Sequence, residues 1–124
     1  MLEKPRLHAM IATANAARAK AFYADVLGLD FASEDAFALI WRVGGEELRM
    51  NKVPAVTPPA YAILGFKVDD MVKNVRALAA KGLQMERFPF LPPDADGIWT
   101  APDGTKVAWF RDPDGNLLSL VQDA

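Results

Sequence analysis

Few side chains in this sequence can carry out acid–base or nucleophilic chemistry. His8 is the only histidine among 124 residues, and the chain has no cysteine. Any imidazole acid or base must therefore be His8, and a thiolate nucleophile or thiolate metal ligand is excluded. The alternative for His8 is a structural role, as a half-buried strand residue whose ring is hydrogen-bonded to a neighbour.

A short polar segment, EELRMN (46–51), supplies the next candidates. In an extended strand, Glu47, Arg49 and Asn51 lie on one face, and the two apolar residues between them lie on the other. The polar face suits a solvent-filled cavity, but it suits an outer surface equally. If the Gly-Gly pair before this segment forms a two-residue turn, Glu47 faces Arg42, and a cross-strand ion pair then explains the glutamate without a ligand.

The segment WFRDPDGNLLSL (109–120) predicts a hairpin. Its DPDG tetrapeptide has the proline and glycine that a bulged type I turn requires, so the flanking residues form antiparallel strands. Closure of this turn places Trp109 opposite Ser119. These two residues lie on the face opposite to Phe110, which we assign to the core.

Further aromatic residues accompany Trp109. Tyr61 shares a strand face with Ile63, and Trp99 lies in the proline- and glycine-containing segment 90–102, which we expect to be a mobile lid. These rings could form flat apolar walls around a small molecule, with a few polar residues to orient it. Packing in the core is the alternative for each ring.

The composition excludes several classes of partner. A formal charge of −2 argues against binding to nucleic acid or to an anionic membrane, because those partners call for a basic excess. The first ten residues, MLEKPRLHAM, lack the apolar core of a signal peptide, and no window approaches the ~20 apolar residues of a membrane span. We therefore expect a cytoplasmic protein that binds neither nucleic acid nor a membrane.

The elements that must position these residues repeat along the chain. The hydrophobic patterns predict strands at 7–13, 29–33, 37–43, 47–53, 61–68 and 83–88, helices at 16–27 and about 70–81, and a last hairpin delimited by PDG turns at 102–104 and 113–115. The order βαβββ thus occurs twice, in module one (about 5–53) and module two (about 61–122), joined by a proline-rich linker (54–60). With 52% hydrophobic residues, a chain of this length fits a single domain, 1–124.

Four segments together carry a family resemblance: HAMIATANAARAKAFYADVLGL (8–29), EELRMN (46–51), ILGFKVDD (63–70) and AWFRDPDGNLLSLVQ (108–122). They resemble the vicinal oxygen chelate superfamily, which comprises the glyoxalase and bleomycin resistance proteins and related dioxygenases. The resemblance implies an α+β fold of two βαβββ modules, each with a cup-shaped mixed sheet and its helix on the outer face. It also implies a homodimer whose cups hold a small-molecule ligand.

Metal-dependent members of that superfamily place metal ligands on the first and last strands of each module. Matched by spacing, those positions fall on His8 and Glu47 in module one, and on Ile63 and Ser119 in module two. The family typically has a histidine where Ile63 stands and a glutamate where Ser119 stands. Two protein donors are fewer than the three that a catalytic metal normally has, so we expect no metal cofactor.

Three functions remain open from the sequence. The leading hypothesis is a protein that binds a small planar or amphipathic molecule without a metal. The ligand-binding residues predicted for it are His8, Glu47, Arg49, Tyr61, Ile63, Trp99, Trp109 and Ser119. The alternative is an enzyme, a metal-dependent lyase, isomerase or dioxygenase, that binds a divalent metal through His8 and Glu47 with further donors such as Asp94, Asp96 or Tyr61. A protein-interaction dimer with a vestigial cup is the third.

Overall fold

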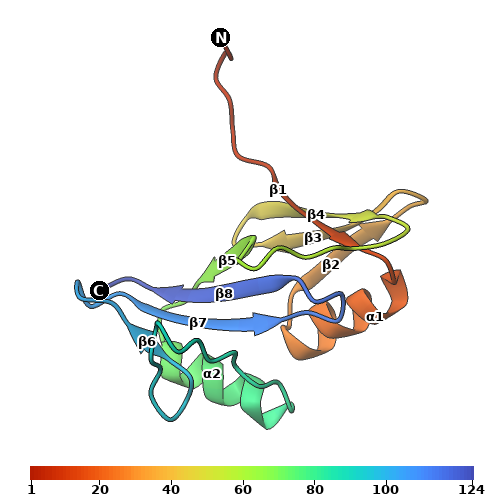
Figure 1. Cartoon of the computed structure of the whole chain (residues 1–124). Coiled ribbons are helices and arrows are strands. Elements are labelled where there is room, and N and C mark those ends of the chain that lie inside the picture. Colours follow the sequence, from red (N-terminus) through yellow and green to blue (C-terminus); the bar gives the residue numbers. More distant parts are fainter. The chain divides into compact units, whose positions relative to one another are not determined.

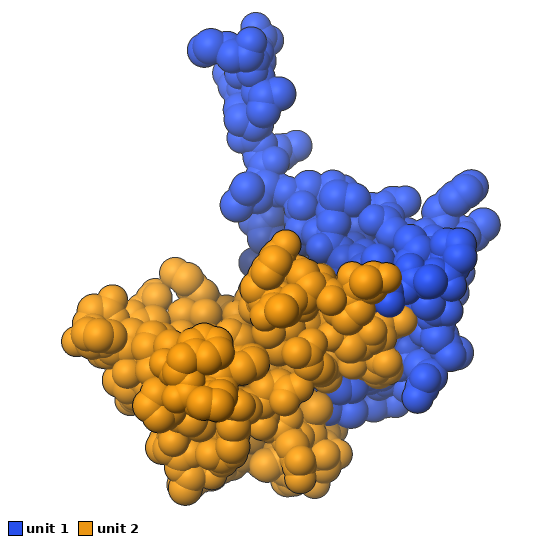
Figure 2. All heavy atoms as spheres, viewed as in Figure 1, with its two compact units in different colours: residues 1–56 blue, residues 57–124 orange.

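The computed structural model describes all residues, 1–124. The chain, traced in Figure 1, forms two compact units, residues 1–56 (unit 1) and residues 57–124 (unit 2), which Figure 2 shows in different colours. Each unit has its own four-stranded sheet and its own α-helix.

Unit 1 has one helical segment after its first strand and three strands after that. Its elements are β1 (Ala9–Thr13), α1 (Ala16–Ala21), the π-helical turn η1 (Phe22–Val26), β2 (Asp30–Glu34), β3 (Ala38–Val43) and β4 (Glu46–Lys52). The strand order is β1-β4-β3-β2, in which β1 runs parallel to β4 and the other neighbours are antiparallel. Gly44 and Gly45, between β3 and β4, have positive φ angles of 56° and 81°, as the predicted two-residue turn requires.

The helical segment of unit 1 starts as predicted but changes type. The side chain of Asn15 accepts a hydrogen bond from the backbone N–H of Arg18 at 3.1 Å, which caps the first turn. The prediction of one α-helix over 16–27 is wrong in its second half, because the chain widens into a π-helix. There the N–H of Leu27 donates to the carbonyl of Phe22, five residues earlier.

The core of unit 1 lies on one face of its sheet. The strand register pairs Trp41 with Leu48, and Leu39 with Met50, so these four side chains share a face, and all four are buried. Tyr23 of η1 is also buried, with its ring centroid 5.8 Å from that of Trp41. The alternate residues of each strand lie on the opposite face, which we call the open face of unit 1.

Unit 2 repeats this order. Its elements are β5 (Leu64–Lys67), α2 (Met71–Ala80), β6 (Trp99–Thr100), β7 (Lys106–Arg111) and β8 (Leu117–Gln122). The strand order, β5-β8-β7-β6, is equivalent to that of unit 1, and β5 runs parallel to β8. The predicted α+β fold with two βαβββ modules is therefore confirmed.

Helix α2 covers one face of the sheet of unit 2. The carboxylate of Asp70 caps the helix by accepting a hydrogen bond from the N–H of Lys73 at 3.1 Å. The helix packs against β7 and β8 (Figure 1), where Ala108, Phe110 and Leu118 are completely buried. The alternate residues of β7 and β8 lie on the opposite face, which we call the open face of unit 2.

The hairpin of β7 and β8 has the predicted register. Trp109 pairs with Ser119, and Phe110 pairs with Leu118. Trp109 and Ser119 therefore lie on the open face of unit 2, because Phe110 lies on the face that α2 covers.

The turn of this hairpin is held by the buried carboxylate of Asp112. Its Oδ1 accepts hydrogen bonds from the backbone N–H groups of Asp114, at 2.9 Å, and Asn116, at 3.0 Å. Its Oδ2 accepts a third from the side-chain amide of Asn116 at 2.9 Å. Asp112 and Asn116 are both buried, so the carboxylate satisfies donors that water reaches poorly.

One prediction about the segment between α2 and β7 is wrong. Residues 83–88 do not form the predicted strand. Their strand-like pairing is limited to two isolated bridges, one at Glu86 and one at Phe88. Prolines at positions 89, 92 and 93 have no N–H to donate, which prevents the pairing from extending. The middle of segment 90–102, which we expected to be a mobile lid, lies beside α2, where Asp96 forms an ion pair with Arg76 at 3.2 Å.

Replacing Asp112 with alanine should lower the free energy of unfolding by about 2–4 kcal/mol, because buried donors of Asn116 lose their acceptor. Urea denaturation of the wild type and the variant measures this loss. The matched control is Asp103→Ala, in the exposed PDG turn, where the carboxylate accepts a hydrogen bond from the N–H of Thr105 at 2.9 Å. The control should lose clearly less stability. Equal losses would contradict the argument that the hydrogen bonds of Asp112 stabilise the fold because they are buried.

Candidate functional site

His8 and Glu47 lie side by side on the open face of unit 1. Extension of the β1–β4 register by one residue places His8 opposite Glu47, and their Nε2 and Oε2 atoms are 3.8 Å apart, which is long for a hydrogen bond. The two side chains are 52% and 46% exposed. The register also pairs Glu47 with Arg42, as predicted, but the ion pair expected between them is replaced by the contact with His8.

Arg49 lies two residues further along β4 on the same face. Its Nε donates a hydrogen bond to Oδ1 of Asn51 at 2.8 Å, which holds the guanidinium group along the strand. Its neighbours across the sheet, Met10 on β1 and Ile40 on β3, are apolar. The structure therefore brings three predicted site residues, His8, Glu47 and Arg49, onto one polar patch.

Four rings form a connected cluster that begins on the open face of unit 2, and we call it the aromatic wall. The ring centroid of Trp109 lies 6.1 Å from that of Trp99 and 5.5 Å from that of Phe88. The centroid of Phe88 lies in turn 5.7 Å from that of Phe90. Phe90 is 76% exposed, and the other three residues are half-buried. The wall therefore presents ring surface to solvent.

Trp99 and Trp109 were predicted from the sequence as site residues, whereas Phe88 and Phe90, which belong to the same cluster in the structure, were not. Their signal is the Phe-Pro-Phe tripeptide at 88–90, because a proline between two rings indicates a turn and not the strand that we predicted. Phe88 makes its isolated bridge to Leu91, across this turn. The turn places its ring edge-on against Trp109, at an interplanar angle of 79°.

The remaining predicted residues of unit 2 differ in their surroundings. Ser119 is 8% exposed and lies beside Gly65 of β5, where an added Cβ would come within 2.8 Å of the serine Oγ. Ile63 lies opposite Leu117, because its N–H donates to the Leu117 carbonyl at 3.0 Å. Tyr61 precedes β5, is 69% exposed and makes no ring contact. The structure thus joins Ser119 to Trp109 but joins neither Ile63 nor Tyr61 to the aromatic wall.

An ion pair borders the aromatic wall. Arg111 lies two residues after Trp109 on β7 and shares its face, and its Nε donates to Oε1 of Glu86 at 2.8 Å. A second donor, Nη1 of Arg111, binds the carbonyl of Gly115 at 2.9 Å. The backbone N–H of Glu86 donates to the carbonyl of Trp109 at 2.7 Å, and this antiparallel bridge places the two side chains on the same face. Neither Glu86 nor Arg111 was predicted as a site residue.

The donors present do not fit a catalytic metal of the kind that the superfamily uses. His8 and Glu47 supply two donors, and no group of three or more His, Cys, Asp or Glu side chains is placed to hold a metal ion. Ile63 has no donor atom. Asp94 and Asp96, considered as further donors, accept hydrogen bonds from backbone N–H groups and from Arg76, respectively. The described side chains therefore do not supply the three protein donors that a catalytic metal normally has.

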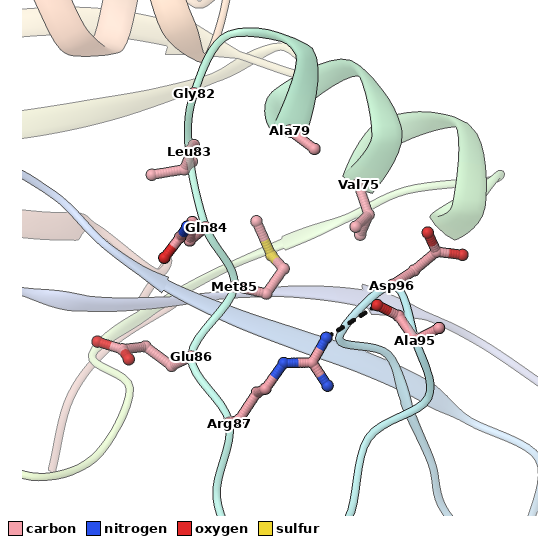
Figure 3. Close-up of a pocket in the computed structure, with 10 residues that line it drawn as sticks. All are labelled: Val75, Ala79, Gly82, Leu83, Gln84, Met85, Glu86, Arg87, Ala95 and Asp96. Atoms are coloured by element: carbon pink, nitrogen blue, oxygen red, sulfur yellow. Dashed lines mark hydrogen bonds between the residues drawn. The ribbon is translucent and has the colours of Figure 1, made fainter.

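A groove of about 740 Å³ lies on the helix side of unit 2, between α2 and segment 82–87 (Figure 3). Its charged groups already have partners. Arg87 donates to the carbonyls of Asp94, at 3.0 Å, and Ala95, at 2.8 Å, and Asp96 is paired with Arg76. The groove contains no aromatic side chain. The aromatic wall is therefore the stronger candidate for a ligand site.

The sequence matches the family model of the Glyoxalase/Bleomycin resistance protein/Dioxygenase superfamily over residues 6–120. No curated protein matches the sequence significantly. In addition, no helix of the structure has both the length and the apolar character needed to cross a membrane.

Several solved structures share the fold. A glyoxalase family protein from Enterococcus faecalis is 24% identical with a TM-score of 0.74, and the match covers 98% of this chain and 99% of that chain. A lactoylglutathione lyase from Agrobacterium tumefaciens is 18% identical with a TM-score of 0.73, over 97% and 94% of the two chains. A genomically encoded fosfomycin resistance protein from Listeria monocytogenes is 12% identical with a TM-score of 0.76, over 99% and 96%.

The family match extends over most of the chain, and the structure has the two βαβββ units that the sequence resemblance implied. The chain therefore belongs to the Glyoxalase/Bleomycin resistance protein/Dioxygenase superfamily.

Proposed function

We propose that the chain binds a small planar or amphipathic molecule on the aromatic wall of unit 2, and that it does so without a metal ion. The observation that carries this proposal is the connected cluster of Phe88, Phe90, Trp99 and Trp109. Contiguous apolar surface that stays exposed on a folded protein commonly marks a binding site. Aromatic side chains favour flat ligands, because rings gain from offset stacking and from edge-to-face contacts beyond the area that they bury.

Polar groups near the wall suit an amphipathic ligand. The Ser119 hydroxyl is the cross-strand neighbour of Trp109, and the ion pair of Glu86 and Arg111 lies along the wall's border. Ile63 is 38% exposed and adds apolar surface to the same unit. The polar patch of His8, Glu47 and Arg49 is proposed separately, as a group of ligand-orienting residues on unit 1.

Two relatives have names that refer to small molecules. One is a lactoylglutathione lyase and another is a fosfomycin resistance protein. These names support a small-molecule ligand for the present chain, although the identities of 18% and 12% carry over the fold alone.

Replacing Trp109 with alanine should weaken the binding of a planar aromatic compound roughly tenfold to a hundredfold, because the loss of a stacking ring costs about 1–3 kcal/mol. A screen of planar aromatic compounds identifies a binder, and calorimetric titration of the wild type and the variant measures the change. The control is Phe37→Ala, which removes an exposed ring of unit 1 and should leave the affinity unchanged. Equal affinity in a folded Trp109→Ala protein would favour the protein-interaction hypothesis instead.

A second candidate function is the metal-dependent lyase, isomerase or dioxygenase. The observation that favours it is the approach of His8 to Glu47, at 3.8 Å, at the two positions where the family resemblance expects metal ligands. It ranks second because these two residues supply only two of the three protein donors that a catalytic metal normally has.

Elemental analysis of protein purified without chelators or an affinity tag separates the two candidates. We expect clearly less than one transition metal ion per chain, because a site with two protein donors binds metal weakly. The metal content should also be the same in wild type and His8→Ala. About one metal ion per chain, lost in His8→Ala, would make the enzyme the better candidate.

We also propose a two-fold symmetric homodimer. Each sheet ends in strands that lack one neighbour within their unit, β1 and β2 in unit 1 and β5 and β6 in unit 2. Exposed apolar side chains, Leu7 and Met10, accompany the edge strand β1. Unpaired strand edges and exposed apolar residues both favour association.

Sedimentation equilibrium at micromolar concentration should therefore report a species of twice the chain mass of 13.6 kDa. Detection of the 13.6 kDa monomer alone would contradict the homodimer. A control in 1 M salt should leave the dimer intact, because the proposed contacts are apolar and backbone contacts that salt does not screen.

A further inference from the structure

The ion pair at the border of the aromatic wall leaves one donor group and one acceptor unused. Arg111 uses Nε for Oε1 of Glu86 and Nη1 for the carbonyl of Gly115, and its Nη2 makes no hydrogen bond within the chain. Oε2 of Glu86 likewise accepts none. The two side chains are 38% and 39% exposed, so neither is buried.

Both groups are directed toward the open face. Arg111 shares the face of Trp109 on β7, because the two residues are two apart on one strand. Glu86 and Met85 both border the groove beneath α2. In Figure 3, however, their side chains lie on opposite sides of the backbone, and the bridge of Glu86 to Trp109 gives the glutamate the same face as the tryptophan. The contact between Arg111 and Glu86 places the glutamate on the arginine's side of the sheet. A molecule stacked on Trp109 would therefore have these polar groups at its edge.

The charges of the pair decide which polar edge fits. A carboxylate or phosphate ligand would gain from Arg111 but would be repelled by Glu86, and a cationic ligand would meet the reverse situation. A neutral edge with one acceptor and one adjacent donor meets no repulsion and satisfies both free groups. Hydrogen bonds to charged groups are also stronger than those between neutral groups.

We propose that the aromatic wall selects a neutral planar heterocycle with a cyclic amide edge. The ring stacks on Trp109, the amide carbonyl accepts a hydrogen bond from Nη2 of Arg111, and the amide N–H donates to Oε2 of Glu86. This assignment rests on the proposed binding function and adds to it the chemical class of the ligand.

A matched pair of probes tests the amide edge. Isoquinolin-1(2H)-one has a fused planar ring with an adjacent carbonyl and N–H, and its N-methyl derivative keeps the ring and the carbonyl but cannot donate. The wild-type protein should bind the first compound roughly tenfold to a hundredfold more tightly, because methylation leaves the Glu86 carboxylate without its hydrogen bond. Calorimetric titration measures the ratio, and amide chemical shifts in NMR locate both compounds.

The variant Glu86→Gln tests the residue that we propose accepts the hydrogen bond from the ligand's amide N–H. Its amide oxygen can still accept from Nε of Arg111, but an NH₂ group then stands where Oε2 stood, so the preference for the unmethylated compound should disappear. The control is Glu46→Gln, which removes the same charge from an exposed glutamate of unit 1 that forms no ion pair. The control should retain the preference.

The outcomes separate this assignment from the proposed function. If the wild type binds both compounds equally and Trp109→Ala weakens both, the aromatic wall binds planar molecules but the amide edge is overturned. A preference that persists in Glu86→Gln overturns the role of Glu86. If a folded protein binds neither compound, the amide class is overturned. The screen of planar compounds then decides whether the aromatic wall binds planar molecules at all.

Discussion

The candidate site of unit 2 depends on the carboxylate of Asp112. This buried group accepts three hydrogen bonds across the turn between β7 and β8 and thereby sets the register of the hairpin. Because successive strand residues point to opposite faces, a slip of one residue would turn Trp109 and Ser119 toward α2 and expose Phe110. Strand β8 also lies between β5 and β7, so its position brings Gly65 beside Ser119 as well. One polar interaction at a turn thus determines which side chains of the hairpin lie on the open face.

Much of this arrangement could be predicted because its causes are local. The N-caps at Asn15 and Asp70, the paired glycines between β3 and β4 and the DPDG turn each act within a few residues. The parts that could not be predicted depend on distant pairing. Glu86 and Arg111 are 25 residues apart. Their contact follows from the bridge that Glu86 makes to Trp109. The hydrophobic pattern of the segment after α2 does not indicate which strand this segment will pair with.

The contact that Glu47 makes was also not predicted from its hairpin, although the register of that hairpin was. The hairpin of β3 and β4 was predicted, and Glu47 does lie opposite Arg42. However, β4 also has β1 as its neighbour on the other side, and that parallel pairing brings His8 within 3.8 Å of the carboxylate. A hairpin rule considers only the strand that is adjacent in sequence, whereas the sheet order gives each central strand two neighbours. The contact between these two candidate site residues came from the strand pair that is distant in sequence.

The two units have the same topology but opposite surface chemistry. The open face of unit 1 carries His8, Glu47 and Arg49, whereas that of unit 2 carries Trp109 with a serine packed closely against Gly65. At the position of this serine the family resemblance expects a glutamate, which is a larger side chain with a charge that would need a counter-ion or a metal beside the rings. A small hydroxyl removes that requirement and leaves the neighbouring ring surface apolar. The charge nearest the wall is instead carried by Glu86, which is already neutralised by Arg111. This surface supports our proposal of a flat neutral ligand rather than one with anionic oxygens that a metal would chelate, because it offers ring contacts and paired hydrogen-bonding groups without a net charge.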